Sequence, residues 1–190
     1  MRQFNFNFCG SNFIADPTGA LIWPKQKLAV VSDLHLGKSV SIAKHTYQFL
    51  PPYDTTETLS SLSNILEKFN VRTVLSLGDS FHNQDVGLLK SDLEFLKQLT
   101  SNYEWLWIIG NHDPWLPHCL KGVHTDELSI HNITFRHEAN FEHKCPEISG
   151  HFHPVVYVRL QGQKIKRRCF IHDKDRLILP AFGSYTGGLN

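Results

Sequence analysis

Three apolar segments of this chain end in polar residues that can bind metals, and two helical patterns separate the segments. The segments are residues 27–32, 71–77 and 105–109, and their lengths and compositions are typical of buried β-strands. Asp33, Asp79 and Asn111 stand within two residues of their ends. A strand–helix–strand–helix–strand order predicts a parallel sheet, whose strands bring these residues to one edge, where α/β folds place their sites.

The rest of the pattern predicts a second sheet. A capping box at residues 54–57 precedes leucines at helical spacing, and the leucines at 89, 93 and 96 mark another helix. Beyond Gly122, short apolar runs at 133–135, 155–158 and 177–179 predict strands of a second sheet, packed on the first with helices outside. We expect residues 1–190 to form one domain, since this length can bury a single sizeable core.

Composition limits the classes of function. The formal net charge is +1, so no overall field attracts nucleic acid. The four scattered cysteines argue against a structural zinc site or a disulfide framework. No apolar stretch approaches the ~20 residues of a membrane span, and the strictly alternating start predicts a strand, so we expect a cytoplasmic protein. One dense basic cluster is either a nucleic-acid contact or a solvated strand edge: Lys164, Lys166, Arg167 and Arg168.

The polar clusters offer carboxylate, imidazole and amide ligands. Asp33 and His35 are one residue apart, as are His151 and His153, so each pair can face a common site. Asp79 could bridge two metals through its two oxygens. Such a set suits two divalent metals that share a bridging carboxylate and promote the attack on a phosphate ester. Asn111 and His137 could complete it.

The order of these motifs resembles the calcineurin-like metallophosphoesterase superfamily. Its pattern is Asp-x-His, Gly-Asp-x-x, Gly-Asn-His-Asp, an isolated His and Gly-His-x-His, which this chain shows between about residues 27 and 155. Each string alone is weak evidence, but four in this order leave little room for coincidence. The resemblance implies an α/β fold, the four-layer αββα sandwich of two mixed β-sheets flanked by helices.

Strings outside the metal motifs resemble a bacterial subgroup, the ligase-associated DNA-damage-response endonuclease or ICC-like phosphoesterase. They include residues 19–24, 50–55, 167–170 and 180–190. This narrower resemblance implies a DNA endonuclease acting in DNA repair. It also implies DNA as the substrate, a functional association with an ATP-dependent DNA ligase and a helicase, and no membrane partner.

The resemblance also assigns roles to single residues. Asp79 matches the bridging ligand, His112 the residue that protonates the leaving group, and Asp113 a partner that orients His112 by a hydrogen bond. Manganese is the commonest functional metal in such nucleases, and iron or zinc also suits the mixed ligands. The ligands of one metal would be Asp33, His35 and His153, and those of the second Asn111, His137 and His151.

The substrate contacts are open from sequence. Arg167 and Arg168 of the basic cluster are candidate substrate-binding residues. His82 is a third candidate, and it could touch a metal, the substrate or only its neighbours. A small-molecule phosphodiesterase or phosphatase is the alternative function, and the near-neutral charge suits it. A non-catalytic protein-binding scaffold of the same fold is a further alternative, although the complete ligand set argues against it.

Overall fold

A computed structural model describes residues 3–45, 51–83, 87–142 and 145–189. Its larger sheet has seven strands in chain order, β1 to β7. β1 to β4 are antiparallel neighbours and β4 to β7 are parallel, so the sheet is mixed and its parallel part is the predicted one. The strands are β1 (Phe4–Phe8), β2 (Ser11–Ala15), β3 (Leu21–Trp23), β4 (Leu28–Val31), β5 (Thr73–Ser76), β6 (Glu104–Ile108) and β7 (Val123–Thr125).

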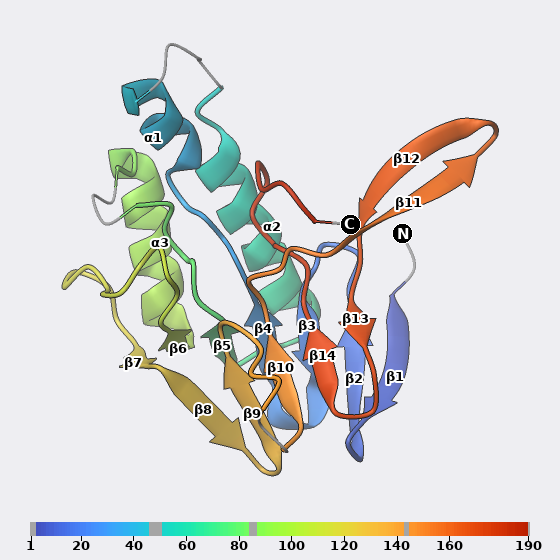
Figure 1. The fold of residues 1–190 in the computed structure, drawn as a ribbon. Helices are drawn as coiled ribbons and strands as arrows, with labels where there is room; N and C mark the ends of the chain where they lie inside the picture. The colour runs from blue at the N-terminus through green and yellow to red at the C-terminus, as the bar shows by residue number, and fades with distance from the viewer. Residues whose placement is uncertain (1–2, 46–50, 84–86, 143–144, 190) are drawn as a thin grey trace.

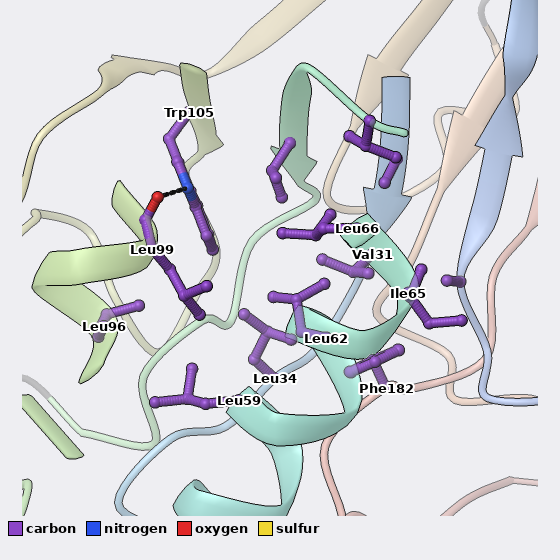
Figure 2. Close-up of a cluster of buried hydrophobic side chains, with 14 of the residues drawn as sticks. Val31, Leu34, Leu59, Leu62, Ile65, Leu66, Leu96, Leu99, Trp105 and Phe182 are labelled. Atoms are coloured by element: carbon purple, nitrogen blue, oxygen red, sulfur yellow. Dashed lines mark hydrogen bonds between the residues drawn. The ribbon is translucent and has the colours of Figure 1, made fainter. Parts of the chain in front are cut away.

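The helices of the described chain lie against one face of this sheet (Figure 1). They are α1 (Lys38–His45), α2 (Asp54–Lys68) and α3 (Lys90–Asn102), with a short 3-10 helix η1 (Pro24–Gln26) between β3 and β4. Leu59, Leu62 and Leu66 of α2 are fully buried against the sheet face that carries Val31 (Figure 2). This burial of one apolar stripe stabilises the helix more than its intrinsic propensity does.

The start of α2 differs from the predicted capping box. Tyr53 occupies the N-cap and makes no side-chain capping bond. Asp54 is buried instead and accepts hydrogen bonds from the backbone N–H and the hydroxyl of Ser39, so its carboxylate serves the first turn of α1. The prediction was wrong about the cap because a tertiary contact takes the carboxylate that a local capping bond would use.

A five-stranded mixed sheet packs on the opposite face of the first. Its order is β13-β14-β10-β9-β8, with parallel pairs at its centre and antiparallel pairs at its edges. Phe135, Ile148 and Leu177 from this sheet are buried with Val30 and Leu75 of the first. Its strands are β8 (Glu127–Ile130), β9 (Ile133–Arg136), β10 (Glu147–Ser149), β13 (Ile171–His172) and β14 (Arg176–Ile178).

These layers confirm the α/β sandwich with two mixed sheets. Among the described residues, α-helices cover the outer face of the seven-stranded sheet alone, so the second flanking helical layer of the predicted four-layer arrangement is not seen in this part of the chain. No helix in the described ranges is both long and apolar enough to traverse a bilayer.

The run at 155–158 belongs to neither sheet, contrary to the prediction. It forms β11 (Val155–Leu160), which pairs with β12 (Gln163–Arg168) in an antiparallel hairpin that projects away from the sandwich (Figure 1). Val156, Val158 and Leu160 are exposed there at 41%, 43% and 62%. An apolar run therefore predicted the strand correctly and its burial wrongly.

Candidate metal centre

The loops that follow β4 and β5 lie side by side at the predicted edge of the sheet. The backbone N–H of His35 donates to the carbonyl of Asp79 at 2.9 Å, and that of Leu36 donates to the carbonyl of Ser80 at 2.9 Å. These bonds continue the parallel pairing past the ends of the strands. As a result, Asp33, His35 and Asp79 are buried beside one another.

The first group of possible metal ligands consists of Asp33, His35 and His153. Each residue offers one metal-binding atom, and these three atoms lie within 4.8 Å of one another. Asp33 Oδ2 accepts hydrogen bonds from the Ser32 hydroxyl at 2.6 Å and the His151 backbone N–H at 3.0 Å. Those two bonds leave Asp33 Oδ1 directed at His153 Nε2, which lies 3.0 Å away. Oδ2 of Asp33 is therefore hydrogen-bonded within the protein, and Oδ1 faces the other two possible ligands.

Asp79, His137 and His151 form the second group by the same distance criterion. His137 Nδ1 lies 2.7 Å from the carbonyl oxygen of Leu77, which can only accept, so this nitrogen carries the proton. In the neutral ring, His137 Nε2 then presents a lone pair to the group. That atom lies 3.0 Å from Asn111 Oδ1 and 3.1 Å from His151 Nδ1.

Asp79 stands between the two groups. Its Oδ2 lies 4.0 Å from His35 Nε2, and its Oδ1 lies 3.5 Å from His137 Nε2. These two distances show that the carboxylate faces both groups, and it is only 4% exposed. The structure brings together all seven predicted ligands in the predicted two sets, with Asp79 in the position expected of a bridge.

The donor set suits divalent cations. Asp33 Oδ1 and His153 Nε2 are buried without a well-formed hydrogen bond among the described residues, although only 3.0 Å separates them. Electron-rich atoms converge in the same way around His137 Nε2. Such buried atoms are unfavourable unless a proton or a metal cation lies between them. Imidazole nitrogens with carboxylate and amide oxygens are ligands for manganese, iron or zinc.

Electrostatics favour the metal-binding forms of two members of the first group, His35 and Asp33. Burial lowers the pKa of His35 to about 3, so its ring is neutral near pH 7. Burial by itself would raise the pKa of Asp33, but the nearby His153 and the hydrogen bond from Ser32 outweigh it and hold that pKa below its usual value. A neutral imidazole and an ionised carboxylate are the forms that coordinate a cation.

Five of the seven ligands have left-handed backbone conformations. Their φ values are 54° at Asp33, 45° at His35, 49° at Asp79, 68° at His151 and 44° at His153. Residues other than glycine adopt this region rarely and at an energetic cost, although Asp and His do so more readily than most. Five other residues of the described chain adopt it outside the site, so it is the concentration of five such residues among seven candidate ligands that sets these loops apart.

The sequence interpretation expected Asp113 to orient His112, but the structure gives Asp113 other partners. Its buried carboxylate accepts hydrogen bonds from the backbone N–H groups of four residues at 2.6–3.1 Å, and none from the His112 ring among the described residues. Burial raises the pKa of Asp113 to about 6, although these N–H donors oppose the rise. Asp113 thus fixes the loop around Asp79. The four donors belong to Asp79, Ser80, Phe81 and Gly110.

The close approach of these loops requires glycine at position 110. A Cβ atom there would clash with the backbone and carboxylate of Asp79 and would lie 2.7 Å from Asp113 Oδ1. Glycine lets the third loop reach the second without displacing either carboxylate. The Gly-Asn-His-Asp string thus combines one possible ligand with the contacts that position Asp79.

His112 lies at the open side of the centre. Its side chain is 42% exposed, and its Nε2 lies 3.9 Å from Asp79 Oδ2. Its backbone N–H donates to Asp79 Oδ1 at 2.9 Å, which fixes the main chain. The ring of His82 stacks on that of His112, with centroids 5.8 Å apart and planes 15° apart. His82 also contacts His35 edge-on, so its ring packs against two residues of the centre.

Arg167 and Arg168, the candidate substrate contacts, differ in their surroundings. Arg168 donates from Nη1 to the carbonyl of Phe182 at 2.8 Å and from Nη2 to that of Gly183. Burial lowers the pKa of its guanidinium. Arg167 is exposed and bonds the carbonyl of Lys166 at 3.0 Å. Arg168 therefore anchors the loop at 182–184, and its use as a mobile phosphate contact is not supported.

This difference predicts a stability effect. Arg168→Ala is expected to lower the free energy of unfolding by about 1–3 kcal/mol, because it leaves part-buried carbonyls without a charged donor. Urea denaturation of wild type and variant measures this. Arg167→Ala is the matched control, since it removes the same charge from the next position and is expected to unfold near the wild-type midpoint. Equal midpoints for the two variants would refute the anchoring role.

The sequence matches the family model for the calcineurin-like phosphoesterases over residues 26–175. The chain therefore belongs to the calcineurin-like phosphoesterase family. This family includes hydrolases that use divalent metals. The two groups of His and Asp side chains that could hold such metals lie in the loops at one edge of the sheet. Among curated proteins, no sequence matches this chain significantly.

Solved structures resemble the fold. The nuclease MPE of Pseudomonas putida is 23% identical, with 99% of this chain and 89% of that chain covered and a TM-score of 0.79. The phosphoesterase Yfce of E. coli is 13% identical, with 85% and 83% covered and a TM-score of 0.48. At these identities, the likeness to the nuclease concerns the fold alone.

Sequence reasoning missed several supporting groups. The Ser32 hydroxyl and the Leu77 carbonyl orient Asp33 and His137. Glu138 lies 3.9 Å from His151 Nε2, beyond hydrogen-bonding distance but close enough for its charge to act on that ring. Ser32 and Glu138 are adjacent in sequence to predicted ligands, a weak signal that could have identified them. A backbone carbonyl gives no such signal.

Proposed function

We propose that the chain is a dinuclear metal-dependent phosphodiesterase that acts as a DNA endonuclease. The observation that carries this proposal is the position of Asp79, whose two carboxylate oxygens each face one group of possible ligands. Membership in the phosphoesterase family supports the reaction class. The similarity in fold to a nuclease supports the choice of nucleic acid.

The proposal gives each residue of the site a role. Asp33, His35 and His153 would hold one cation, and His137, His151 and Asn111 the other, with Asp79 shared. When bound, the two cations supply Lewis-acid activation of water and neutralise charge on the phosphate oxygens. His112, exposed beside Asp79, would donate a proton to the leaving oxygen. Asp113 would hold the Asp79 loop in place.

His82 would keep the His112 ring in position. It stacks on that ring and contacts His35. Burial, with the positive charges of Lys38 and His112, lowers the pKa of His82. A neutral His82 can lie beside a protonated His112 without repelling it. The described contacts of His82 do not support its assignment as a direct substrate contact.

A metal-dependent activity panel tests the proposal. It compares supercoiled plasmid, single-stranded DNA, bis-p-nitrophenyl phosphate and p-nitrophenyl phosphate, each with manganese, iron, zinc or magnesium. We expect nicking of plasmid or cleavage of single strands, and hydrolysis of the diester, with manganese most effective. Activity confined to the monoester would instead support a phosphatase. No hydrolysis with any metal would favour the non-catalytic scaffold.

The cellular role and the partners rest on the sequence resemblance, and the cytoplasmic location rests on the sequence pattern. A role in DNA repair, an association with an ATP-dependent DNA ligase or a helicase, and a cytoplasmic location remain predictions. Co-purification of the ligase with the tagged protein is the direct measurement. It is independent of the activity panel, since a nuclease need not bind that ligase stably.

A further inference from the structure

A small basic pocket adjoins the candidate metal centre. It has a volume of about 190 Å³ and lies between β12 and the glycine-rich loop that ends the described chain. His153, a candidate ligand of the first group, forms part of its wall, with Lys166, Arg168 and Thr186. No carboxylate lines it. Its volume is below that of sites for drug-sized molecules, and its charge favours a compact anion.

The pocket contains polar groups that a phosphate would satisfy. Thr186 Oγ1 is buried and has no hydrogen-bond partner among the described residues. Buried hydroxyls are nearly always hydrogen-bonded, so this atom has an unused hydrogen-bonding capacity in a residue that lines the pocket. Lys166 Nζ donates to the carbonyl of Gly188 at 3.0 Å, which fixes the ammonium at the pocket. An ammonium has three donors, so two remain for an anion.

The register of the hairpin extends the basic surface beyond the pocket. Tyr157 pairs with Lys166, and Arg159 pairs with Lys164, so these four side chains share one face. Lys164 Nζ lies 4.1 Å from the centroid of the Tyr157 ring. The other face carries Val156, Val158 and Leu160 of β11 opposite Arg167, Ile165 and Gln163 of β12, so it is more apolar but includes one arginine. Basic side chains at every second residue, ~6.6 Å apart along a strand, can follow a phosphate backbone.

We propose that this pocket binds the phosphate next to the scissile one in a nucleic-acid strand, through Thr186, Lys166 and the positive charge of Arg168. The inference rests on the proposed function, because it needs a phosphodiester at the metal centre. A phosphate in the pocket and one beside His153 can then belong to one strand. Monoesters and small diesters lack the second phosphate, so the pocket favours polynucleotides.

Chromogenic substrates test this directly. The first is the p-nitrophenyl ester of thymidine 5′-phosphate, and the second is the same ester extended by one nucleotide, which adds one phosphate. A third has an uncharged methylphosphonate at the added linkage. A matching set of 3′-esters covers the opposite strand direction. The measured quantity is the ratio of kcat/KM values between the extended and the short ester.

We expect wild type to prefer the extended ester about tenfold or more in one direction, as suits a charge-assisted contact. The preference should fall to about one with the methylphosphonate, and also in the Thr186→Val/Lys166→Ala variant. Lys174→Ala, which removes an equal charge from a side chain 89% exposed in the turn before β14, should keep it. Thermal melting and metal content of each variant verify the fold.

The outcomes separate the two proposals. Hydrolysis of both esters with no preference in either direction would overturn the pocket and leave the phosphodiesterase standing. A preference that survives in the double variant would likewise overturn it. Failure of wild type to hydrolyse any ester with any metal would overturn the proposed function itself.

Discussion

Asp79→Asn is expected to lose divalent-metal binding and the proposed phosphodiesterase activity together. The substitution preserves size but removes the negative charge that faces both candidate ligand groups. Loss of a partner that merely orients a ligand typically lowers metal affinity or activity 10–100-fold, so removal of a shared ligand should cost more than about 100-fold. Elemental analysis of the purified variant and its rate on bis-p-nitrophenyl phosphate measure both effects.

The control must lose a buried carboxylate elsewhere. Asp92 of α3 is 3% exposed and accepts a hydrogen bond from Thr56 at 2.6 Å, so Asp92→Asn makes the same chemical change within the helical layer. It is expected to retain metal and activity. Two equivalents of metal and full activity in Asp79→Asn would end the proposal of a bridging carboxylate.

The parallel strands and their ligands were predictable because both are encoded locally. β4, β5 and β6 are buried on both faces and therefore appear in sequence as short apolar runs. Chain connectivity then places the residues after them at one edge of the sheet. The strand β11 shows the limit of this reasoning, since Val156 and Val158 have the composition of a buried strand but lie on an exposed hairpin.

The remaining differences arise from contacts between segments distant in sequence. Asp113 follows His112 directly but binds the loop at 79–81, 32 to 34 residues away. Arg168 bonds carbonyls 14 and 15 residues further along. A side chain's hydrogen-bonding capacity is evident from sequence, but which partner takes it depends on how the sheets pack. The left-handed φ values of Asp33 and His153 likewise arise in the packed loops, in residue types that adopt this region more readily than most.

His112→Ala is expected to lower activity by roughly 10²–10⁴-fold while metal stays bound, because in the proposed mechanism the ring donates a proton and does not bind a metal. The loss should depend on the leaving group. The p-nitrophenyl ester of thymidine 5′-phosphate expels a stable anion and needs little protonation, whereas the phenyl ester needs more. The variant should therefore be impaired more strongly on the phenyl ester, and the ratio of the two kcat values reports this.

His131→Ala is the control for the loss of an imidazole. His131 is exposed in the turn before β9, at the end of that strand opposite His137, and it is expected to have wild-type kinetics on both esters. His82→Ala distinguishes donation from positioning: if His82 only holds the His112 ring by stacking, its loss should reproduce the same leaving-group dependence at smaller amplitude. An equal loss on both esters in His112→Ala would show that His112 binds the phosphate instead of protonating the leaving oxygen.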